Sequence, residues 1–201
     1  MRLTYDIETN MCSKDTWDKK VFLNNVVSLA CICIQDMDSG EQFIYHDNPD
    51  LGRTGTNEEG VLKLLEAKLL VAHNGKGFDL PALQALYPEH SEALAKVRQF
   101  DTLSASRDIF DWKFLKEYDK KNNVQHNEYN AKSLHSLGAY GDRFAAKGKV
   151  EAMKDEEFKA TVDWTNIQIN QDLINYCMQD VVVNIHVFDT LVKAKQQMRN
   201  S

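Results

Sequence analysis

The sequence predicts an α/β protein in which helices cover a mixed β-sheet. Three observations lead to this prediction: β-forming segments fill the first third, one short strand lies between helical segments, and the last third has helical apolar spacing. The 201 residues suit a single compact domain, residues 1–201, with one active site. Hydrophobic residues make up 43% and charged residues 27%, which is typical of a globular protein and not of a disordered or fibrous one.

Three strands are predicted near the start of the chain. Leu3–Thr9 alternates in part and contains β-forming residues, and Val26–Ile34 is a longer apolar run that is typical of a central strand. Gln42–His46 follows the turn signal at Asp38–Gly40. We expect the three segments to form an antiparallel meander.

The middle of the chain alternates between helix and strand. Helical apolar spacing predicts a helix over Asn57–Leu69, and a short strand, Leu69–Ala72, follows it. The turn His73–Gly77 leads into a helix over Leu80–Leu86, whose early Pro81 is tolerated because the first helical turn has free N–H groups.

The second half is expected to be mostly helical. Gln99–Leu103 is predicted to be a strand that leads into a helix ending near Trp112. Lys113–Asn130 is polar, charged and weakly periodic, so we expect a mobile loop or lid within the domain. Helical spacing returns over Ala131–Tyr140 and over Ile169–Gln197, where it predicts one long C-terminal helix or two consecutive ones.

Properties of the whole chain limit the possible functions. The N-terminus lacks a secretory signal and no segment approaches the roughly 20 apolar residues of a membrane span, so we expect a cytoplasmic protein without membrane contact. The four cysteines lack zinc-ligand spacing and are expected to be buried free thiols. A net charge of −6 and a pI near 5.5 argue against a firm grip on long duplex DNA, although bound cations would cancel part of this charge.

The first chemically suggestive pair is Asp6 and Glu8, two residues apart on the first predicted strand. Alternate strand residues point to the same side, so both carboxylates are expected on one face while Ile7 points to the other. Taken alone, the pair is explained at least as well by the solvent-exposed face of an edge strand.

Two further acidic positions are also ambiguous when taken singly. Asp79 lies where a strand leads into a helix, and an N-cap is the simplest interpretation. Tyr176 and Asp180 are four residues apart in the C-terminal helix and share a face, as residues between core and solvent often do. Taken together, however, the acidic residues suit Mg²⁺ or Mn²⁺, because two such ions need a cluster of carboxylates to hold them.

These motifs resemble those of the DEDD exonucleases of the ribonuclease H-like superfamily, also called DnaQ-like. The D-x-E, N-x-x-x-F-D and Y-x-x-x-D motifs of that family are matched, in order, by Asp6 and Glu8, by Asn74, Phe78 and Asp79, and by Tyr176 and Asp180. Asn175 stands where the histidine subclass has its histidine, so the chain resembles the tyrosine subclass. The resemblance implies a ribonuclease H-like mixed sheet with flanking helices, and 3′→5′ exonuclease activity.

Within that family the chain is most similar to the proofreading exonuclease domain of family-A DNA polymerases of short-tailed, T-odd-like phages. The similarity rests on His73–Gly75, Phe78–Asp79, Pro81–Leu83, Asp101–Leu103, Tyr176 and Gln179–Val183. It is weakest over Lys113–Asn130, and no polymerase part follows the last motif. The resemblance therefore implies a free-standing enzyme, or a proofreading subunit beside a separate DNA polymerase, encoded by a phage and active in the infected host cytoplasm.

The resemblance also implies roles for the acidic residues. Asp6, Glu8 and Asp180 would hold one Mg²⁺ or Mn²⁺ ion. Asp6 would bridge to a second ion, which Asp79 would support through water. Tyr176 would orient the attacking water rather than act as a strong base, because a phenol with a pKa of about 10 is protonated at neutral pH.

Residues near the first two motifs are expected to contact the 3′ end of single-stranded DNA. They are Thr9, Asn10, Met11, Cys12, Asn74 and Phe78. Phe78 could equally be a core residue. Basic residues that could contact phosphates, although a solvated surface explains most lysines equally, are Lys113, Lys116, Lys120, Lys121, Lys132, Arg143, Lys147 and Lys149.

Two other functions fit the sequence. The same metal site would serve a 3′→5′ exoribonuclease, because telling RNA from DNA depends on contacts to the 2′-OH. A non-catalytic module that binds beside a polymerase would be expected to lack a carboxylate or the tyrosine of the motifs, and none is missing.

Overall fold

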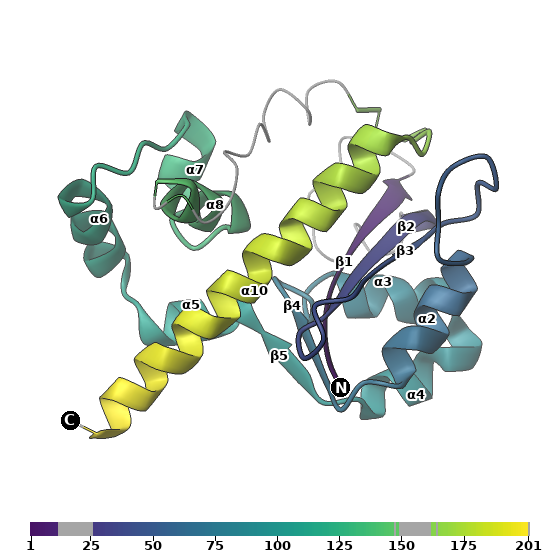
Figure 1. The fold of residues 1–201 in the computed structure, drawn as a ribbon, viewed down its shortest axis with the longest axis horizontal. Helices are drawn as coiled ribbons and strands as arrows, with labels where there is room; N and C mark the ends of the chain where they lie inside the picture. The colour runs from purple at the N-terminus through teal and green to yellow at the C-terminus, as the bar shows by residue number, and fades with distance from the viewer. Residues whose placement is uncertain (12–25, 147, 149–161, 164, 201) are drawn as a thin grey trace.

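The computed structural model describes residues 1–11, 26–146, 148, 162–163 and 165–200. A mixed sheet of five strands, in the order β3-β2-β1-β4-β5, forms its centre (Figure 1). The strands are β1 (Arg2–Met11), β2 (Val26–Asp36), β3 (Gln42–Tyr45), β4 (Leu69–Ala72) and β5 (Gln99–Asp101). β1, β2 and β3 pair antiparallel, as the predicted meander requires, whereas β4 pairs parallel with both β1 and β5. The predicted α/β architecture is confirmed.

The helices form two groups about the sheet. One group contains α2 (Asn57–Leu65), α3 (Asp79–Leu86), the 3₁₀ helix η1 (Pro88–His90) and α4 (Ser91–Lys96). The other contains α5 (Thr102–Ile109), α6 (Trp112–Lys121), α7 (Glu128–Lys132), α8 (Leu137–Ala145) and α10 (Gln171–Asn200). In Figure 1 the long helix α10 runs diagonally across the molecule, with α2, α3 and α4 on one side of it and α6, α7 and α8 on the other. Within the described ranges, no helix is long and apolar enough to span a membrane.

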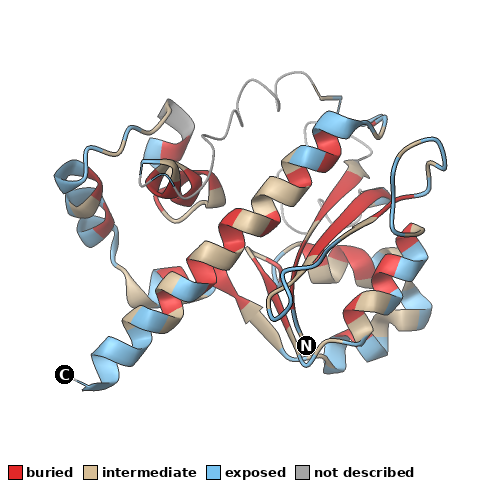
Figure 2. Ribbon diagram, viewed as in Figure 1, coloured by how far each residue is buried: buried red, intermediate tan, exposed pale blue. Residues whose placement is uncertain are grey.

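Alternation along β1 divides the interior between the two faces of the sheet. Leu3, Tyr5 and Ile7 pack in one core with apolar residues of α2, α3 and α4. On the opposite face, the two cysteines of β2 pack against the first turns of α10. Figure 2 shows β1, β2 and β4 buried along most of their length, while the last turns of α10 are exposed. The long helix therefore covers the face of β1 that carries the D-x-E carboxylates.

The prediction of a mobile loop or lid at 113–130 is wrong for most of that segment. Trp112–Lys121 forms α6, and α7 begins at Glu128. Asp111 caps α6 by accepting a hydrogen bond from the Phe114 N–H at 2.7 Å. The apolar periodicity is weak because the buried side of this helix carries the charged Asp119 beside Leu115. Tertiary contacts of that aspartate help to stabilise the helix.

Those contacts are a buried ionic network that joins α6 and α8 to the connection before α7. Arg143 donates from Nε and Nη2 to the two Asp119 carboxylate oxygens at 2.7 and 2.8 Å. His126 lies 3.0 Å from Asp119 Oδ2 and 2.7 Å from Asp142 Oδ2. Hydrogen bonds to Asp119 and then to Asp142 raise the pKa of His126 to about 9. Arg143 is thus a buried structural residue, and its predicted role as a phosphate contact is wrong.

Several element boundaries also differ from the predictions. The helix predicted over Ala131–Tyr140 is two helices, because Ser136 caps a new helix by accepting from the Ala139 N–H. β5 ends at Asp101, which caps α5 in the same way. The helix predicted over Asn57–Leu69 ends at Leu65, the helix predicted to end near Trp112 ends at Ile109, and η1 and α4 were not predicted. The C-terminal helix is continuous.

Candidate active site

Asp6 and Glu8 lie side by side on the face of β1 that α10 covers. In the antiparallel pairing with β2, Asp6 is opposite Cys33 and Glu8 is opposite Cys31. The Cys177 thiol of α10 lies 3.5 Å from Asp6 Oδ2, and one donor atom from each of Asp6, Glu8 and Cys177 lies within 4.8 Å of the others. The structure therefore brings the two carboxylates together as their spacing predicts.

The pairing of β1 with β2 becomes irregular directly after Glu8. Glu8 is opposite Cys31 but Thr9 is opposite Leu29, so Ala30 is left without a counterpart. A second register shift follows between Asn10 and the last residue of the strand. Such bulges re-aim side chains and are frequent beside active sites.

The turn between β4 and α3 positions Asp79. Asn74 adopts a left-handed conformation with φ 65°, and its N–H donates to Asp101 Oδ1 at 3.2 Å. The N–H groups of Lys76 and Ser104 also donate to the Asp101 carboxylate, each at 3.1 Å. Asp101 thus fastens this turn to the first turn of α5.

Two glycines allow the same turn to close. A Cβ atom at Gly75 would lie 2.5 Å from the Ala72 Cβ, and one at Gly77 would lie 2.5 Å from the Asn74 Oδ1. The Ala72 Cβ cannot move away without the backbone, so the close approach of the chain requires glycine at position 75, whereas a side chain at position 77 would displace the Asn74 amide. The Asn74 side chain, which belongs to the N-x-x-x-F-D motif, therefore packs against Gly77 within the turn.

Asp79 lies against β1. It is the first residue of α3 and Phe78 is the N-cap, so the simple capping interpretation of Asp79 is wrong. Burial raises the pKa of Asp79 to about 7, and repulsion from Asp101 adds to this. Hydrogen bonds from its own backbone and from the backbone of Ile7 oppose that rise in pKa. The Ile7 bond places this carboxylate beside the D-x-E strand.

Helix α10 brings Asp180 to the same place. Tyr176 precedes Asp180 by one turn, on the same side of the helix, and both are partly buried. Burial is the largest reason that the pKa of Asp6 is raised well above its ordinary value. Repulsion from three other carboxylates adds to it, in the order Asp180, Asp79 and Glu8. Asp6 is therefore near enough to the other three carboxylates for their charges to raise its pKa, and Glu8 is the one that shares a group of donor atoms with it.

The chemistry of this donor set fits hard divalent cations. Asp6 and Glu8 lie together on β1, and the charges of Asp79 and Asp180 from two other segments act on Asp6. Bringing like charges near one another in a buried place is costly without a counter-ion. Mg²⁺ and Mn²⁺ prefer carboxylate and water oxygens, and a pair of them needs several acidic groups between which to sit.

The residues predicted to contact substrate have varied placements. Thr9 is buried, and Phe78 packs partly buried against the core that faces α2 and α3. The Asn10 side chain donates to Ser28 Oγ at 2.9 Å and accepts from the Ile167 N–H at 2.5 Å. This amide thus joins β1 to the segment before α10.

Three further residues complete the set of predicted substrate contacts. Asn74 packs within the turn, Met11 ends β1, and Cys12 lies outside the described residues, as do Lys147 and Lys149. Substrate contact by all six residues stays a prediction.

The site contains residues to which sequence reasoning gave no role. Asp101 organises the turn before Asp79, and its place directly before a helix was the signal that could have identified it as a cap. Cys177 donates from Sγ to the Asp6 carbonyl oxygen and to Oδ2, each at 3.5 Å. Thr102 donates to Asn184 Oδ1 at 2.6 Å and lies 3.0 Å from His73 Nδ1, so it links the end of β4 to α10.

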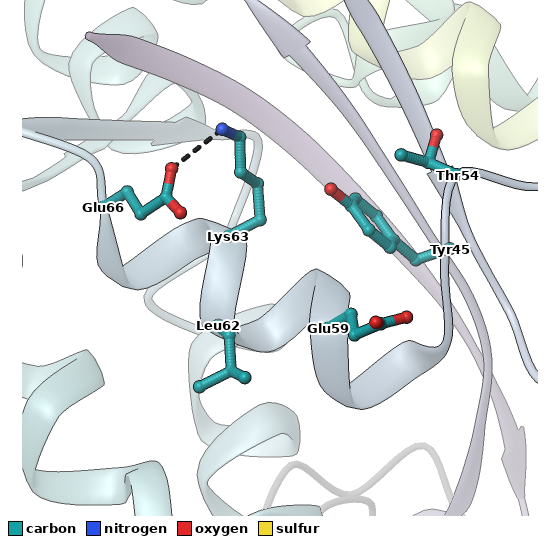
Figure 3. A pocket seen from close by; sticks show the side chains of 6 residues that line it. All are labelled: Tyr45, Thr54, Glu59, Leu62, Lys63 and Glu66. Carbon is teal, nitrogen blue, oxygen red and sulfur yellow. Dashed lines mark hydrogen bonds and ion pairs between the residues drawn. The ribbon is translucent and has the colours of Figure 1, made fainter.

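A separate hollow of about 260 Å³ lies beside α2 and β3 and contains none of the motif residues (Figure 3). Lys63 and Glu66 form an ion pair of 2.8 Å at its edge. The residues that line it are Tyr45, Thr54, Glu59, Leu62, Lys63 and Glu66.

Fold and site together define an α/β protein whose mixed sheet carries a buried acidic cluster under a long C-terminal helix. The family model of the RNase H superfamily matches residues 3–192. The chain therefore belongs to the RNase H superfamily, and the predicted ribonuclease H-like fold is confirmed. A comparison with curated protein sequences gives no significant match.

Solved structures with a similar fold include NrnC from Brucella melitensis. NrnC with bound Mg²⁺ aligns with a TM-score of 0.52 and 16% identity, over 100% of this chain and 76% of NrnC. NrnC bound to pGG gives 0.52 and 17%, over 98% and 74%. A structure described as the apo form of a nuclease gives 0.53 and 14%, over 98% and 73%. At these identities the similarity concerns the fold alone.

Proposed function

We propose that this protein is a metal-dependent 3′→5′ exonuclease of the DEDD type, tyrosine subclass, that hydrolyses single-stranded DNA to nucleoside 5′-monophosphates. The observation that supports the proposal is that Glu8 lies beside Asp6 on β1 and that the charges of Asp180, Asp79 and Glu8 all raise the pKa of Asp6. Membership of the RNase H superfamily and the Mg²⁺ bound by NrnC support it.

The carboxylates are proposed to hold two Mg²⁺ or Mn²⁺ ions. Asp6, Glu8 and Asp180 are the ligands assigned to one ion, and Asp6 is shared with the other, which Asp79 supports through water. Two such ions supply a bound water of lowered pKa and neutralise charge on the leaving 3′ oxygen. The chain's own part is to fix the carboxylates on β1, α3 and α10.

Tyr176 is proposed to orient the attacking water. It precedes Asp180 by one helical turn, so its phenol lies on the side of α10 that carries the acidic cluster. A phenol that is protonated at neutral pH can hold the water by a hydrogen bond and leave proton removal to other groups.

An end-labelling experiment tests the activity. A single strand labelled at its 5′ end, incubated with Mg²⁺ or Mn²⁺, should give a ladder that shortens one nucleotide at a time. The same strand labelled at its 3′ end should release labelled mononucleotide at once.

The matched variants for that experiment lie on the same helix. Asp180→Ala should lose activity by on the order of 10³-fold, because metal-based charge stabilisation is worth several kcal/mol. Asp189→Ala, which changes an exposed aspartate of α10, should keep it. Internal cleavage products, or equal activity in Asp180→Ala, would overturn the mechanism.

A second candidate is a 3′→5′ exoribonuclease with the same site. The observation that favours it is the pGG bound by NrnC, which shares the fold. Matched DNA and RNA oligonucleotides discriminate between the two, and faster degradation of RNA would make this candidate the better one.

The resemblance to phage polymerase domains suggests proofreading beside a separate DNA polymerase as the biological role. A proofreading enzyme should remove a mismatched 3′ terminal nucleotide faster than a paired one, because proofreading acts on a frayed end. Equal removal of both would argue against this role. A non-catalytic binding module, the remaining alternative, would show no Mn²⁺-dependent activity and no effect of Asp180→Ala.

A further inference from the structure

Three cysteines meet on the same face of the sheet as the carboxylates. Cys31 and Cys33 are two residues apart on β2 and point to the same side, toward Cys177 on α10. All three are free thiols with no exposed surface. Their sulfur atoms lie within 4.8 Å of one another. The fold has thus gathered three of the four cysteines of the chain at one point.

This sulfur cluster directly adjoins the acidic cluster. Across the β1–β2 pairing, Cys33 is opposite Asp6 and Cys31 is opposite Glu8. Directly opposed residues in an antiparallel pair have Cβ atoms roughly 5 Å apart. Cys177 Sγ is 3.5 Å from Asp6 Oδ2. Cys177 therefore belongs to two groups of donor atoms, one with the other sulfurs and one with Asp6 and Glu8.

The two groups suit different metals. Thiolates prefer Zn²⁺ and Cd²⁺, whereas carboxylates and water prefer Mg²⁺ and Mn²⁺. Three thiolates and one further ligand make a tetrahedral zinc site, in which Zn–S bonds of about 2.3 Å hold the sulfurs roughly 3.8 Å apart. The sulfurs here need to move little to reach that separation. Asp6, whose Oδ2 lies 3.5 Å from Cys177 Sγ, would supply the fourth ligand after moving closer to Cys31 and Cys33.

We propose that Cys31, Cys33 and Cys177 form, with Asp6, a binding site for a thiophilic divalent cation such as Zn²⁺ or Cd²⁺, and that its occupation inhibits the enzyme. Inhibition follows because Asp6 also belongs to the carboxylate cluster and cannot fully serve both sites. This inhibitory part rests on the proposed nuclease function, whereas the binding of the cation does not.

A bound cation explains the position of the three sulfurs better than apolar packing alone or a disulfide does. Packing against Ile174 and Val181 explains why each thiol is buried, but not why the sulfurs adjoin one another and a carboxylate. A disulfide would need an oxidant to reach thiols that have no exposed surface. A cation would have to reach the same buried sulfurs, and Asp6, which is only partly buried and contacts Cys177, is the proposed point of entry.

Cadmium absorption tests the site without reference to activity. Cd²⁺ added to the reduced, metal-free protein should produce the ultraviolet charge-transfer band of cadmium thiolate, saturating at one equivalent with the intensity of three thiolates. Excess Mg²⁺ should not remove the band, because Mg²⁺ does not compete for sulfur. Absence of the band in the folded wild-type protein would overturn the proposal.

Cysteine variants show whether the band belongs to this cluster. Cys33→Ala should weaken Cd²⁺ binding by at least about tenfold and lower the band intensity, and Cys31→Ala should do the same. Cys12→Ala, which removes the fourth cysteine, is the matched control and should keep both. Circular dichroism identifies any variant that does not fold. If one of the Cys31→Ala and Cys33→Ala variants does not fold, the other one still tests the assignment. Loss of the band in Cys12→Ala, with the band kept in those two variants, would contradict it.

An activity measurement then tests inhibition. Zn²⁺ should inhibit Mg²⁺-dependent degradation of single-stranded DNA by the wild-type protein. Cys33→Ala should keep its basal activity and need at least about tenfold more Zn²⁺ for half-inhibition. Equal sensitivity of the two proteins would overturn the inhibitory role. A protein that shows the cadmium band but no nuclease activity would contradict the proposed function and leave the cation site standing.

Discussion

The surroundings of Asp6 disfavour its negative charge. Its neighbours are three carboxylates and a thiol, and each of those carboxylates adds to the burial that raises its pKa. In the metal-free protein the repulsion between these carboxylates destabilises the folded state. A bound cation would attract the same carboxylates and so stabilise the folded state. Residue-scale predictions therefore concern charge and positioning at this cluster.

Replacing the central carboxylate should stabilise the metal-free protein. Asp6→Asn keeps the shape of the side chain and removes one repelling charge, so we expect a gain of on the order of 1–3 kcal/mol in the free energy of unfolding at pH 8. Mn²⁺ should raise the melting temperature of the wild-type protein but not of this variant. Thermal unfolding with and without Mn²⁺ measures both effects, with Asp189→Asn as control. A destabilised Asp6→Asn protein would show that repulsion is not the dominant interaction there.

Removal of one hydroxyl tests the role of the tyrosine. Tyr176→Phe should lower the rate of hydrolysis by about 10–100-fold, because the attacking water loses its positioning partner. Its Mn²⁺ affinity, measured by calorimetry, should stay the same. A loss of Mn²⁺ binding, or an unchanged rate, would contradict the assigned role.

Asp101 should act on the site through the turn that it holds. Asp101→Ala removes the acceptor of three backbone N–H groups, so a loss of about 1–2 kcal/mol in stability is expected. Activity should fall with it, because Asp79 follows the same turn. Asp101→Asn keeps one acceptor oxygen and should recover part of both. If the asparagine variant is no better than the alanine variant, the hydrogen bonds are not what matters.

At the scale of elements, ionic contacts join α6 to α8, in addition to the apolar packing of Tyr140 and Phe144 of α8 against α10. Asp119 of α6 is bonded by Arg143 of α8 and by His126 of the connection before α7, so one buried carboxylate joins two helices and a loop. This arrangement explains why the sequence of α6 resembles that of a loop. A polar pair such as Asp119 and Arg143, whose members are 24 positions apart, leaves no periodic signal in the local sequence.

The same network predicts a dependence of stability on pH. The pKa of His126 is about 9 in the folded protein and about 6.5 in an unfolded chain. Its contribution to stability is therefore complete below about pH 6.5 and is lost as the pH rises through about 9. The contribution is at most about 3 kcal/mol.

Denaturant unfolding across pH measures that contribution. The free energy of unfolding of the wild-type protein, minus that of His126→Gln, should decline between about pH 6.5 and 9.5. A substitution in η1, His90→Gln, controls for loss of any histidine. A difference that stays constant with pH would mean that His126 is not charged in the fold.

At the scale of the whole molecule, the sheet, the long C-terminal helix and the shared face of Asp6 and Glu8 followed from periodicity alone. The assembly of the cluster did not, because it depends on how α10 crosses the sheet, which no local pattern contains. Cys33 is an example of a neighbour that the local sequence does not predict. Its place beside Asp6 depends on the register of the β1–β2 pairing, and a shift of one residue would turn its side chain to the other face of the sheet. Asp101 was missed for a similar reason, since two of its hydrogen-bond partners lie more than twenty positions earlier.

The central claim is that carboxylates from three segments converge because cations sit between them. A crystal structure of the protein soaked in Mn²⁺, with anomalous diffraction measured at the manganese edge, tests it most directly. We predict two anomalous peaks about 3.5–4 Å apart, with Asp6 oxygens between them and with Glu8, Asp79 and Asp180 around them. Peaks elsewhere on the molecule, or a cluster without manganese whose carboxylates point apart, would contradict the account.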